Sequence, residues 1–147
     1  MHFKEIVLIC GRYYADVNSL INQYKDADNI HILKSVNNIE DYMKKADLAI
    51  SAGGTTLYEL CACGTPTISY AFADNQLENV NGFAENDIIE YAGDVRYEDI
   101  FENIKKIIEK YRESKEIREM YSRKMQSLVD GNGASRIVLE WKELLKE

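Results

Sequence analysis

Short apolar stretches alternate with amphipathic ones along the first part of the sequence. The apolar stretches have the length and continuous hydrophobicity of strands that are covered on both faces, and they predict strands at residues 5–10, 30–33, 47–51, 67–70 and 88–91. The stretches between them predict helices at residues 16–25, 39–45, 56–63 and 76–86. Strands and helices that alternate at this interval favour an α/β fold built on a doubly wound parallel sheet.

The last third of the sequence is helical in its spacing throughout. Apolar side chains repeat every three or four residues in three successive stretches, within residues 97–111, 117–128 and 134–145. These stripes predict additional carboxyl-terminal helices that pack on a core. We find no internal repeat and no linker, so residues 1–147 are expected to form a single domain.

Composition excludes several classes of protein. The chain has 147 residues and a net charge of −7, and nine acids but only one base, Arg96, lie between Asp74 and Glu102. A nucleic-acid-binding protein would show a basic face instead, so no nucleic-acid partner is expected. No apolar run is long enough to span a bilayer and no signal peptide is apparent, so a cytoplasmic location is expected.

Cysteine and histidine offer no metal site or redox site. Cys10, Cys61 and Cys63 fit neither a zinc spacing nor a redox pair, so we expect three buried free thiols, no metal and no cofactor. His2 and His31 have no serine–acid partner nearby, and no catalytic acid or base is evident.

One later motif, Asp130-Gly-Asn-Gly133, superficially resembles a calcium loop. Trp141 stands at the twelfth position, where a calcium loop needs a glutamate. We therefore expect a turn that begins the final helix.

The most informative motif is Ser51-Ala-Gly-Gly-Thr-Thr-Leu-Tyr-Glu59, which joins a predicted strand to a predicted helix. Glycine lets the backbone approach a ligand closely, and the helix start directs free N–H groups and a positive dipole end to the same place. The motif matches neither the dinucleotide fingerprint nor the P-loop. Taken alone, it predicts a phosphate site or only a tight turn.

Two further loops follow predicted strands, Gly11-Arg-Tyr-Tyr14 and Ala71-Phe-Ala-Asp-Asn-Gln76. In an open parallel sheet, ligands bind beyond the carboxyl ends of the strands, so the three loops are expected to converge. Thr56 and Glu59 have the spacing of a capping box, and spacing alone favours the cap over binding of vicinal ribose hydroxyls by Glu59. Asp74-Asn-Gln76 opens another helix, where Asp or Asn is an ordinary N-cap, and Gln76 has both the donor and the acceptor that suit sugar hydroxyls.

The motifs are similar in combination to the carboxyl half of GT-B proteins. The stretches that carry the resemblance are Ala46-Asp-Leu-Ala-Ile-Ser-Ala-Gly-Gly-Thr-Thr-Leu-Tyr-Glu-Leu60, Cys63-Gly-Thr-Pro-Thr-Ile68 and Ala73-Asp-Asn-Gln-Leu-Glu-Asn79. Two further stretches make the chain most similar to the UDP-sugar hydrolases of pseudaminic acid synthesis and their spore-coat polysaccharide relatives. They are Gly11-Arg-Tyr-Tyr-Ala-Asp16 and Asp130-Gly-Asn-Gly-Ala-Ser-Arg136. The resemblance covers nearly the whole chain.

This resemblance implies a Rossmann-like lobe that binds a UDP-sugar without a cofactor. Gly54, Thr55 and Thr56, preceded by Gly53, would face the diphosphate, and Glu59 would hold the ribose. The backbone at Val36 would contact the uracil, as in the related enzyme that makes lipid II. Asn75 and Gln76 would face the sugar or the diphosphate, and the loop with Gly11 and Tyr13 would look across the cleft.

The resemblance also implies an amino-terminal lobe that this chain does not contain. The catalytic histidine would lie on that lobe, supplied in cis or by a separate chain, so the expected function is the UDP-sugar-binding half of a hydrolase. A GT-B glycosyltransferase half, similar to the N-acetylglucosaminyltransferase that makes lipid II, is one alternative, and a non-catalytic nucleotide-sugar-binding or regulatory module is another. The apolar surface that the other lobe would cover is expected to favour a homodimer.

Overall fold

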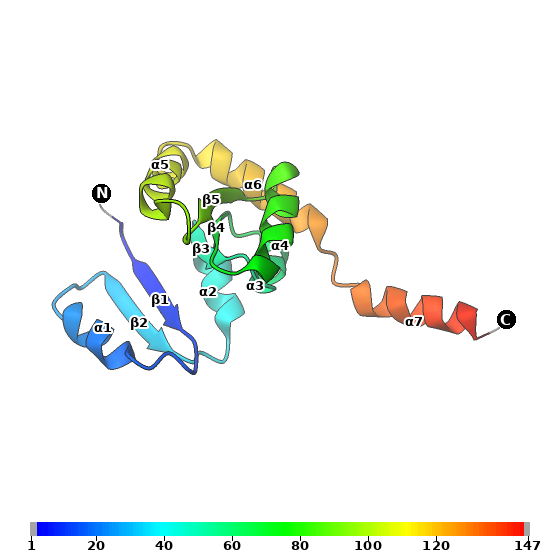
Figure 1. The fold of residues 1–147 in the computed structure, drawn as a ribbon, viewed down its shortest axis with the longest axis horizontal. Helices are drawn as coiled ribbons and strands as arrows, with labels where there is room; N and C mark the ends of the chain where they lie inside the picture. The colour runs from blue at the N-terminus through cyan, green and yellow to red at the C-terminus, as the bar shows by residue number, and fades with distance from the viewer. Residues whose placement is uncertain (1–2, 146–147) are drawn as a thin grey trace. The chain divides into compact units, whose positions relative to one another are not determined.

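The computed structural model describes residues 3–145, which form an α/β protein with parallel sheets (Figure 1). The chain divides into two compact units, Met1–Ile39 and Glu40–Glu147. The first contains β1 (Ile6–Cys10), α1 (Val17–Gln23) and β2 (Ile30–Lys34). From the unit boundary onwards follow α2 (Ile39–Lys45), β3 (Ala49–Ala52), α3 (Thr56–Cys63), β4 (Thr67–Ala71), α4 (Asp74–Glu85), β5 (Glu90–Asp94), α5 (Ile100–Glu113), α6 (Lys115–Leu128) and α7 (Gly133–Leu144).

The first unit is one strand–helix–strand crossover. β1 and β2 pair in parallel, with Ile6 opposite Ile30 and Cys10 opposite Lys34. Parallel pairing needs a crossover, and α1 provides it. Val17, at the start of α1, and Cys10, at the end of β1, are the buried apolar residues of this unit.

The second unit is built on a three-stranded parallel sheet of order β3-β4-β5. The central strand β4 is the most buried of the three, which suits its continuous apolar and small side chains. β5 packs against α5, and α3 packs against α6 (Figure 1). The largest apolar side chains with almost no exposed surface come from β4 and from the helices α3, α4, α5 and α6, and they form the core: they include Leu57, Ile68, Val80, Tyr111 and Met125.

The expectation of an α/β fold with parallel strands is confirmed. The two helices predicted at residues 39–45 and 56–63 have the predicted bounds, and Gly64 ends the second with a left-handed φ of 69°. The last strand begins at Glu90, later than predicted, because Asp87 and Ile88 close α4 through backbone bonds to Ala84 and Phe83. Whether the two units form the single predicted domain stays a prediction.

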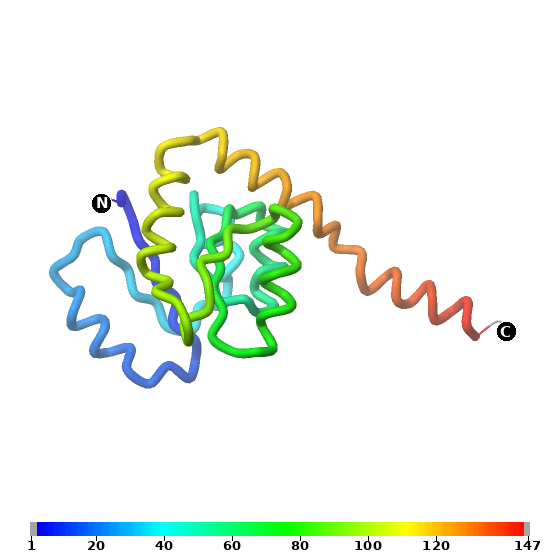
Figure 2. The backbone as a smooth tube through the Cα atoms, turned by 45° about the horizontal axis from the view of Figure 1, so that its top comes forward, coloured from blue at the N-terminus to red at the C-terminus, as the bar shows by residue number. Residues whose placement is uncertain are grey.

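The three predicted carboxyl-terminal helices are present. Asp99 caps α5 and the Ser114 hydroxyl caps α6. Ser114 is the one residue between the two helices, which therefore meet at a tight turn (Figure 2). The Asp130 carboxylate accepts the Asn132 N–H, and the turn that it forms leads into α7, as expected. α7 has no buried residue, and Trp141 on it is 66% exposed, which corrects the expectation that the stripe within residues 134–145 packs on a core.

The cysteines and the helices bear on two further expectations. All three cysteines are free thiols; Cys10 and Cys61 are buried, whereas Cys63 is half-buried, which corrects its expected full burial. Within residues 3–145, the helices are all too short or too polar to cross a bilayer.

Candidate functional site

The glycine pair between β3 and α3 occupies two different environments. Gly53 is buried against α4, and a Cβ there would lie 2.1 Å from Cγ1 of Val80. A Cβ on Gly54 would meet no atom within 4 Å. Neither glycine has a positive φ, so backbone freedom does not require them, and steric space requires a glycine only at position 53. Gly53 allows the turn to pack on α4, and Gly54 leaves an open approach to the backbone.

The start of α3 offers unpaired donors. The Gly54 N–H donates to the Ala52 carbonyl at 2.8 Å, so it is already engaged. The N–H groups of Thr55 and Thr56 have no acceptor among the residues that the structure describes. Free amides and the positive end of the helix dipole make this turn suited to an anion such as a phosphate.

The capping box expected from spacing alone is not formed. The N-cap of α3 is Thr55 rather than Thr56, and its side chain makes no capping hydrogen bond. Its φ of −63° and ψ of −20° are already helical, whereas a capping residue normally has extended backbone angles. Glu59 is exposed one turn further along α3, and no hydrogen bond is found for it within residues 3–145. Its carboxylate is therefore available to a ligand.

A second helix starts beside the first turn, at the carboxyl end of β4. The N-cap of α4 is Ala73, which has extended backbone angles and no side chain that could cap. Gln76 is buried, and its Oε1 accepts the Phe72 N–H at 3.0 Å, which closes the loop before α4. Its Nε2 has no acceptor within residues 3–145, so these donors remain for a ligand, and Asn75 beside it is exposed.

Asn79 joins the two loops and was not predicted. Its Nδ2 donates to the carbonyl of Gly53 at 3.0 Å and to that of Gly54 at 3.2 Å. This side chain therefore directs the two carbonyls of the turn towards α4. Asn79 lies three residues after Gln76 on a predicted helix, and residues at that spacing share a face, so periodicity could have indicated it.

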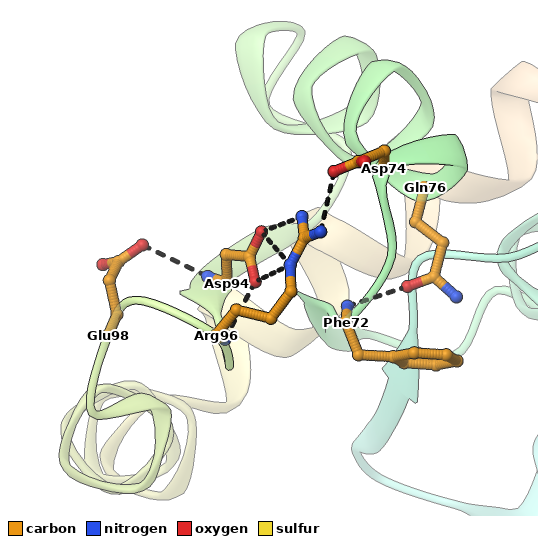
Figure 3. A network of polar contacts seen from close by, with 6 residues as sticks. All are labelled: Phe72, Asp74, Gln76, Asp94, Arg96 and Glu98. Atoms are coloured by element: carbon orange, nitrogen blue, oxygen red, sulfur yellow. Dashed lines mark hydrogen bonds and ion pairs between the residues drawn. The ribbon is translucent and has the colours of Figure 1, made fainter.

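An ionic network lies at the carboxyl ends of β4 and β5 (Figure 3). Arg96 donates through Nη2 to Oδ2 of Asp94 at 2.7 Å and through Nη1 to Oδ1 of Asp74 at 2.7 Å. These hydrogen bonds from Arg96 hold the pKa of Asp94 below its usual value, and the two carboxylates raise the pKa of Arg96. In the sequence, Arg96 stands out only as an isolated base among acids.

The predicted residues of the first unit lie at the carboxyl ends of its two strands. The Ser35 N–H, after β2, donates to the Cys10 carbonyl at the end of β1, so the loops that carry Val36 and Gly11 are neighbours. Val36 is half-buried, whereas Tyr13 is 92% exposed. In the second unit, the loop between β3 and α3 lies next to the start of α4. This places the predicted residues Gly53, Gly54, Thr55 and Thr56 beside Asn75 and Gln76.

The residues that the structure describes show no metal-binding cluster of histidine, cysteine and acidic side chains. His31 lies on β2 with its Nε2 3.6 Å from Oε1 of Glu5, and His2 lies outside the described residues. An open pocket of about 360 Å³ lies beside Asp47 and Pro66, where β3 and β4 begin. It is at the opposite end of the sheet from the loops above.

Comparison with known proteins identifies the domain. Residues 1–133 match the glycosyltransferase family 28 C-terminal domain. The chain is 33% identical over 142 residues to a UDP-N-acetylglucosamine–N-acetylmuramyl-(pentapeptide) pyrophosphoryl-undecaprenol N-acetylglucosamine transferase of Helicobacter acinonychis (strain Sheeba), covering 91% of this chain and 40% of the relative. The transferase of the same name from Lactococcus lactis subsp. lactis (strain IL1403) is 30% identical over 121 residues, covering 76% of this chain and 34% of the relative.

These relatives correct the narrower resemblance seen in the sequence. They are transferases, so the comparisons support the carboxyl-terminal GT-B lobe but not the UDP-sugar hydrolases of pseudaminic acid synthesis. The chain spans about 40% of the length of the Helicobacter acinonychis relative. Its parallel sheets and intervening helices agree with a Rossmann-like lobe of that kind. The chain belongs to the family of glycosyltransferase family 28 C-terminal domains.

Proposed function

We propose that this chain binds the UDP-sugar donor of a glycosyltransferase. The observation that carries the proposal is the start of α3, where the Thr55 and Thr56 amides have no acceptor among the described residues and Gly54 leaves the backbone open. A diphosphate needs such donors, and the family to which the chain belongs is a part of glycosyltransferases. The names of the relatives make UDP-N-acetylglucosamine the donor to test first.

Each part of the donor has a proposed partner. The diphosphate would accept hydrogen bonds from the amides and hydroxyls of Thr55 and Thr56. The exposed Glu59 carboxylate would accept from the two ribose hydroxyls one turn further along α3. Asn75 and the free Nε2 of Gln76 would bind the sugar or the diphosphate.

The first unit would bind the other parts of the donor. The backbone at Val36 would contact the uracil. The exposed loop with Gly11 and Tyr13 would supply a further contact to the donor.

The proposed reaction is transfer of the sugar to an acceptor hydroxyl. The acceptor oxygen attacks the anomeric carbon, the bond from that carbon to the diphosphate breaks, and UDP leaves with the bonding electron pair. The acceptor proton passes to a general base. The amides at the start of α3 stabilise the negative charge that develops on the leaving diphosphate.

We propose that the general base and the acceptor site belong to another lobe, in cis or in trans, because the relatives are more than twice as long as this chain. Transfer to an acceptor replaces attack by water in this proposal because the relatives are transferases. Cytoplasmic location and a homodimer stay predictions.

Calorimetric titration with UDP and ADP tests the assignment. Glu59→Gln keeps the size of the side chain but weakens the hydrogen bonds from the ribose, and we expect affinity for UDP to fall by about tenfold. Glu109→Gln removes an equally exposed carboxylate from α5 and should leave affinity unchanged. No binding of UDP, or equal binding of UDP and ADP, would refute the proposal.

A further inference from the structure

Arg96 is the only base among nine acids between Asp74 and Glu102, and the proposed donor site does not use it directly. Its guanidinium is held in place from the β5 side. Nε lies 3.0 Å from Oδ1 of Asp94 and Nη2 lies 2.7 Å from Oδ2, while the backbone N–H of Arg96 donates to Oδ1 at 3.0 Å. The Asp94 side chain is 8% exposed and that of Arg96 is 30% exposed, so the carboxylate side of this fork is largely protected from water.

Asp94 is itself fixed by its surroundings. Its backbone N–H donates to Oε1 of Glu98 at 3.1 Å, and the following residue, Val95, donates its N–H to the Ala71 carbonyl at 2.9 Å. The end of β5 is therefore tied to the end of β4, directly before the loop that leads into α4. A rigid anchor at this point places the remaining Nη1 of Arg96 in a defined position.

Nη1 reaches across to the first turn of α4, where it lies 2.7 Å from Oδ1 of Asp74 (Figure 3). The Asp74 side chain is 86% exposed, so apolar packing does not hold it. Among the residues described, the only other hydrogen bond to a side chain that closes the loop between β4 and α4 is the one from the Phe72 N–H to Oε1 of Gln76. Arg96 thus ties the α4 start, with Asn75 and Gln76, to the sheet.

The geometry points to Arg96 as a positioning residue that fixes the start of α4 for the sugar part of the donor. It also pairs with the Asp74 carboxylate, which would otherwise face an anionic donor unpaired. A lysine would keep the positive charge but could not make the fork to Asp94 and reach Asp74 at the same time. This inference rests on the proposed function, because it assigns the sugar to the α4 start.

The test compares Arg96→Gln and Arg96→Lys with the unmodified chain, and uses Arg112→Gln, an exposed arginine on α5, as the matched control. The first measurement is amide hydrogen exchange over residues 72–76 without ligand. We expect exchange to be faster by about tenfold in both Arg96 variants and unchanged in the control.

The second measurement is the ratio of the affinities for UDP-N-acetylglucosamine and UDP. We expect both Arg96 variants to lower this ratio by about tenfold, because the sugar loses its ordered partners while the diphosphate keeps the α3 amides. Unchanged exchange in Arg96→Gln, wild-type behaviour of Arg96→Lys, or an equal loss of affinity for both ligands would each overturn the inference.

The failure of the proposed function looks different. If the unmodified chain binds neither ligand, the donor site is wrong and the sugar assignment falls with it. Faster exchange in both variants would then still support Arg96 as the residue that orders the α4 start, and unchanged exchange would overturn that role as well.

Discussion

Substituting alanine for Gly53 should destabilise the protein, whereas the same change at Gly54 should not. In Gly53→Ala the new methyl group would lie 2.1 Å from Cγ1 of Val80, which is fully buried and has no room to withdraw. The turn must therefore move away from α4. That movement also stretches the hydrogen bonds from Asn79 to the carbonyls of Gly53 and Gly54.

The expected loss can be worked from these contacts. Overpacking costs about 1–3 kcal/mol, and two weakened hydrogen bonds add about 1 kcal/mol, so the free energy of unfolding should fall by about 3 kcal/mol. With a urea m-value of about 1.5 kcal/mol/M, the unfolding midpoint moves down by about 2 M. Gly54→Ala should stay within about 0.5 kcal/mol of the unmodified chain, because its Cβ meets no atom.

Urea unfolding followed by far-ultraviolet circular dichroism measures both variants. The clash is isolated by adding Val80→Ala, which removes the methyl group that Gly53→Ala meets. The double variant should be at least about 1 kcal/mol more stable than the sum of the single changes predicts. Gly54→Ala should instead weaken UDP binding by about tenfold, because its methyl group fills the proposed approach to the backbone. Equal stability of the two glycine variants, or additive effects in the double variant, would refute the reasoning.

Three other predictions concern single side chains. Asn79→Asp removes the donor that holds the two carbonyls of the turn, and should lower the free energy of unfolding by about 2 kcal/mol in urea titrations, with no loss in the exposed control Asn81→Asp. Asp94 has a lowered pKa in the folded protein, so its contribution to stability is present above its unfolded-state pKa and is lost as the pH falls through its folded-state pKa. Asp94→Asn should therefore make the thermal unfolding temperature fall less steeply as the pH is lowered over this range. Burial raises the pKa of the Cys61 thiol to about 11, so a thiol reagent at pH 8 should modify the half-buried Cys63 before Cys61. Peptide mass spectrometry measures the two labelling rates, and faster labelling of Cys61 would contradict this prediction.

The sequence predicted most of the elements because their signals are local. Apolar runs indicated the strands, and Gly64 with Pro66 marked the end of α3 and the start of β4. The start of β5 was predicted too early because Ile88 is apolar yet belongs to the close of α4. Hydrophobicity does not distinguish a buried residue of a helix end from the first residue of a strand.

The candidate site was predicted only in part, for a related reason. The Gly-Gly-Thr-Thr turn and the α4 start were identified because the motif and its place after a strand are visible along the chain. Spacing could not decide whether Glu59 caps α3, since the same interval serves a cap and a ligand; the backbone angles at Thr55 decided against the cap. Val36 was named by resemblance alone, whereas the loop with Gly11 and Tyr13 was also indicated by its place after a predicted strand, and the role of all three in binding stays a proposal.

The sequence by itself determined the alternation of strands and helices, the run of acids between Asp74 and Glu102 and the place of the main motif, because all three can be read from residues that are close along the chain. Only the tertiary structure decided that Gly53 is required by Val80, that Asn79 holds the turn, and that Arg96 joins Asp94 to Asp74. Each of these contacts joins residues on different elements, and their distances depend on how the chain packs.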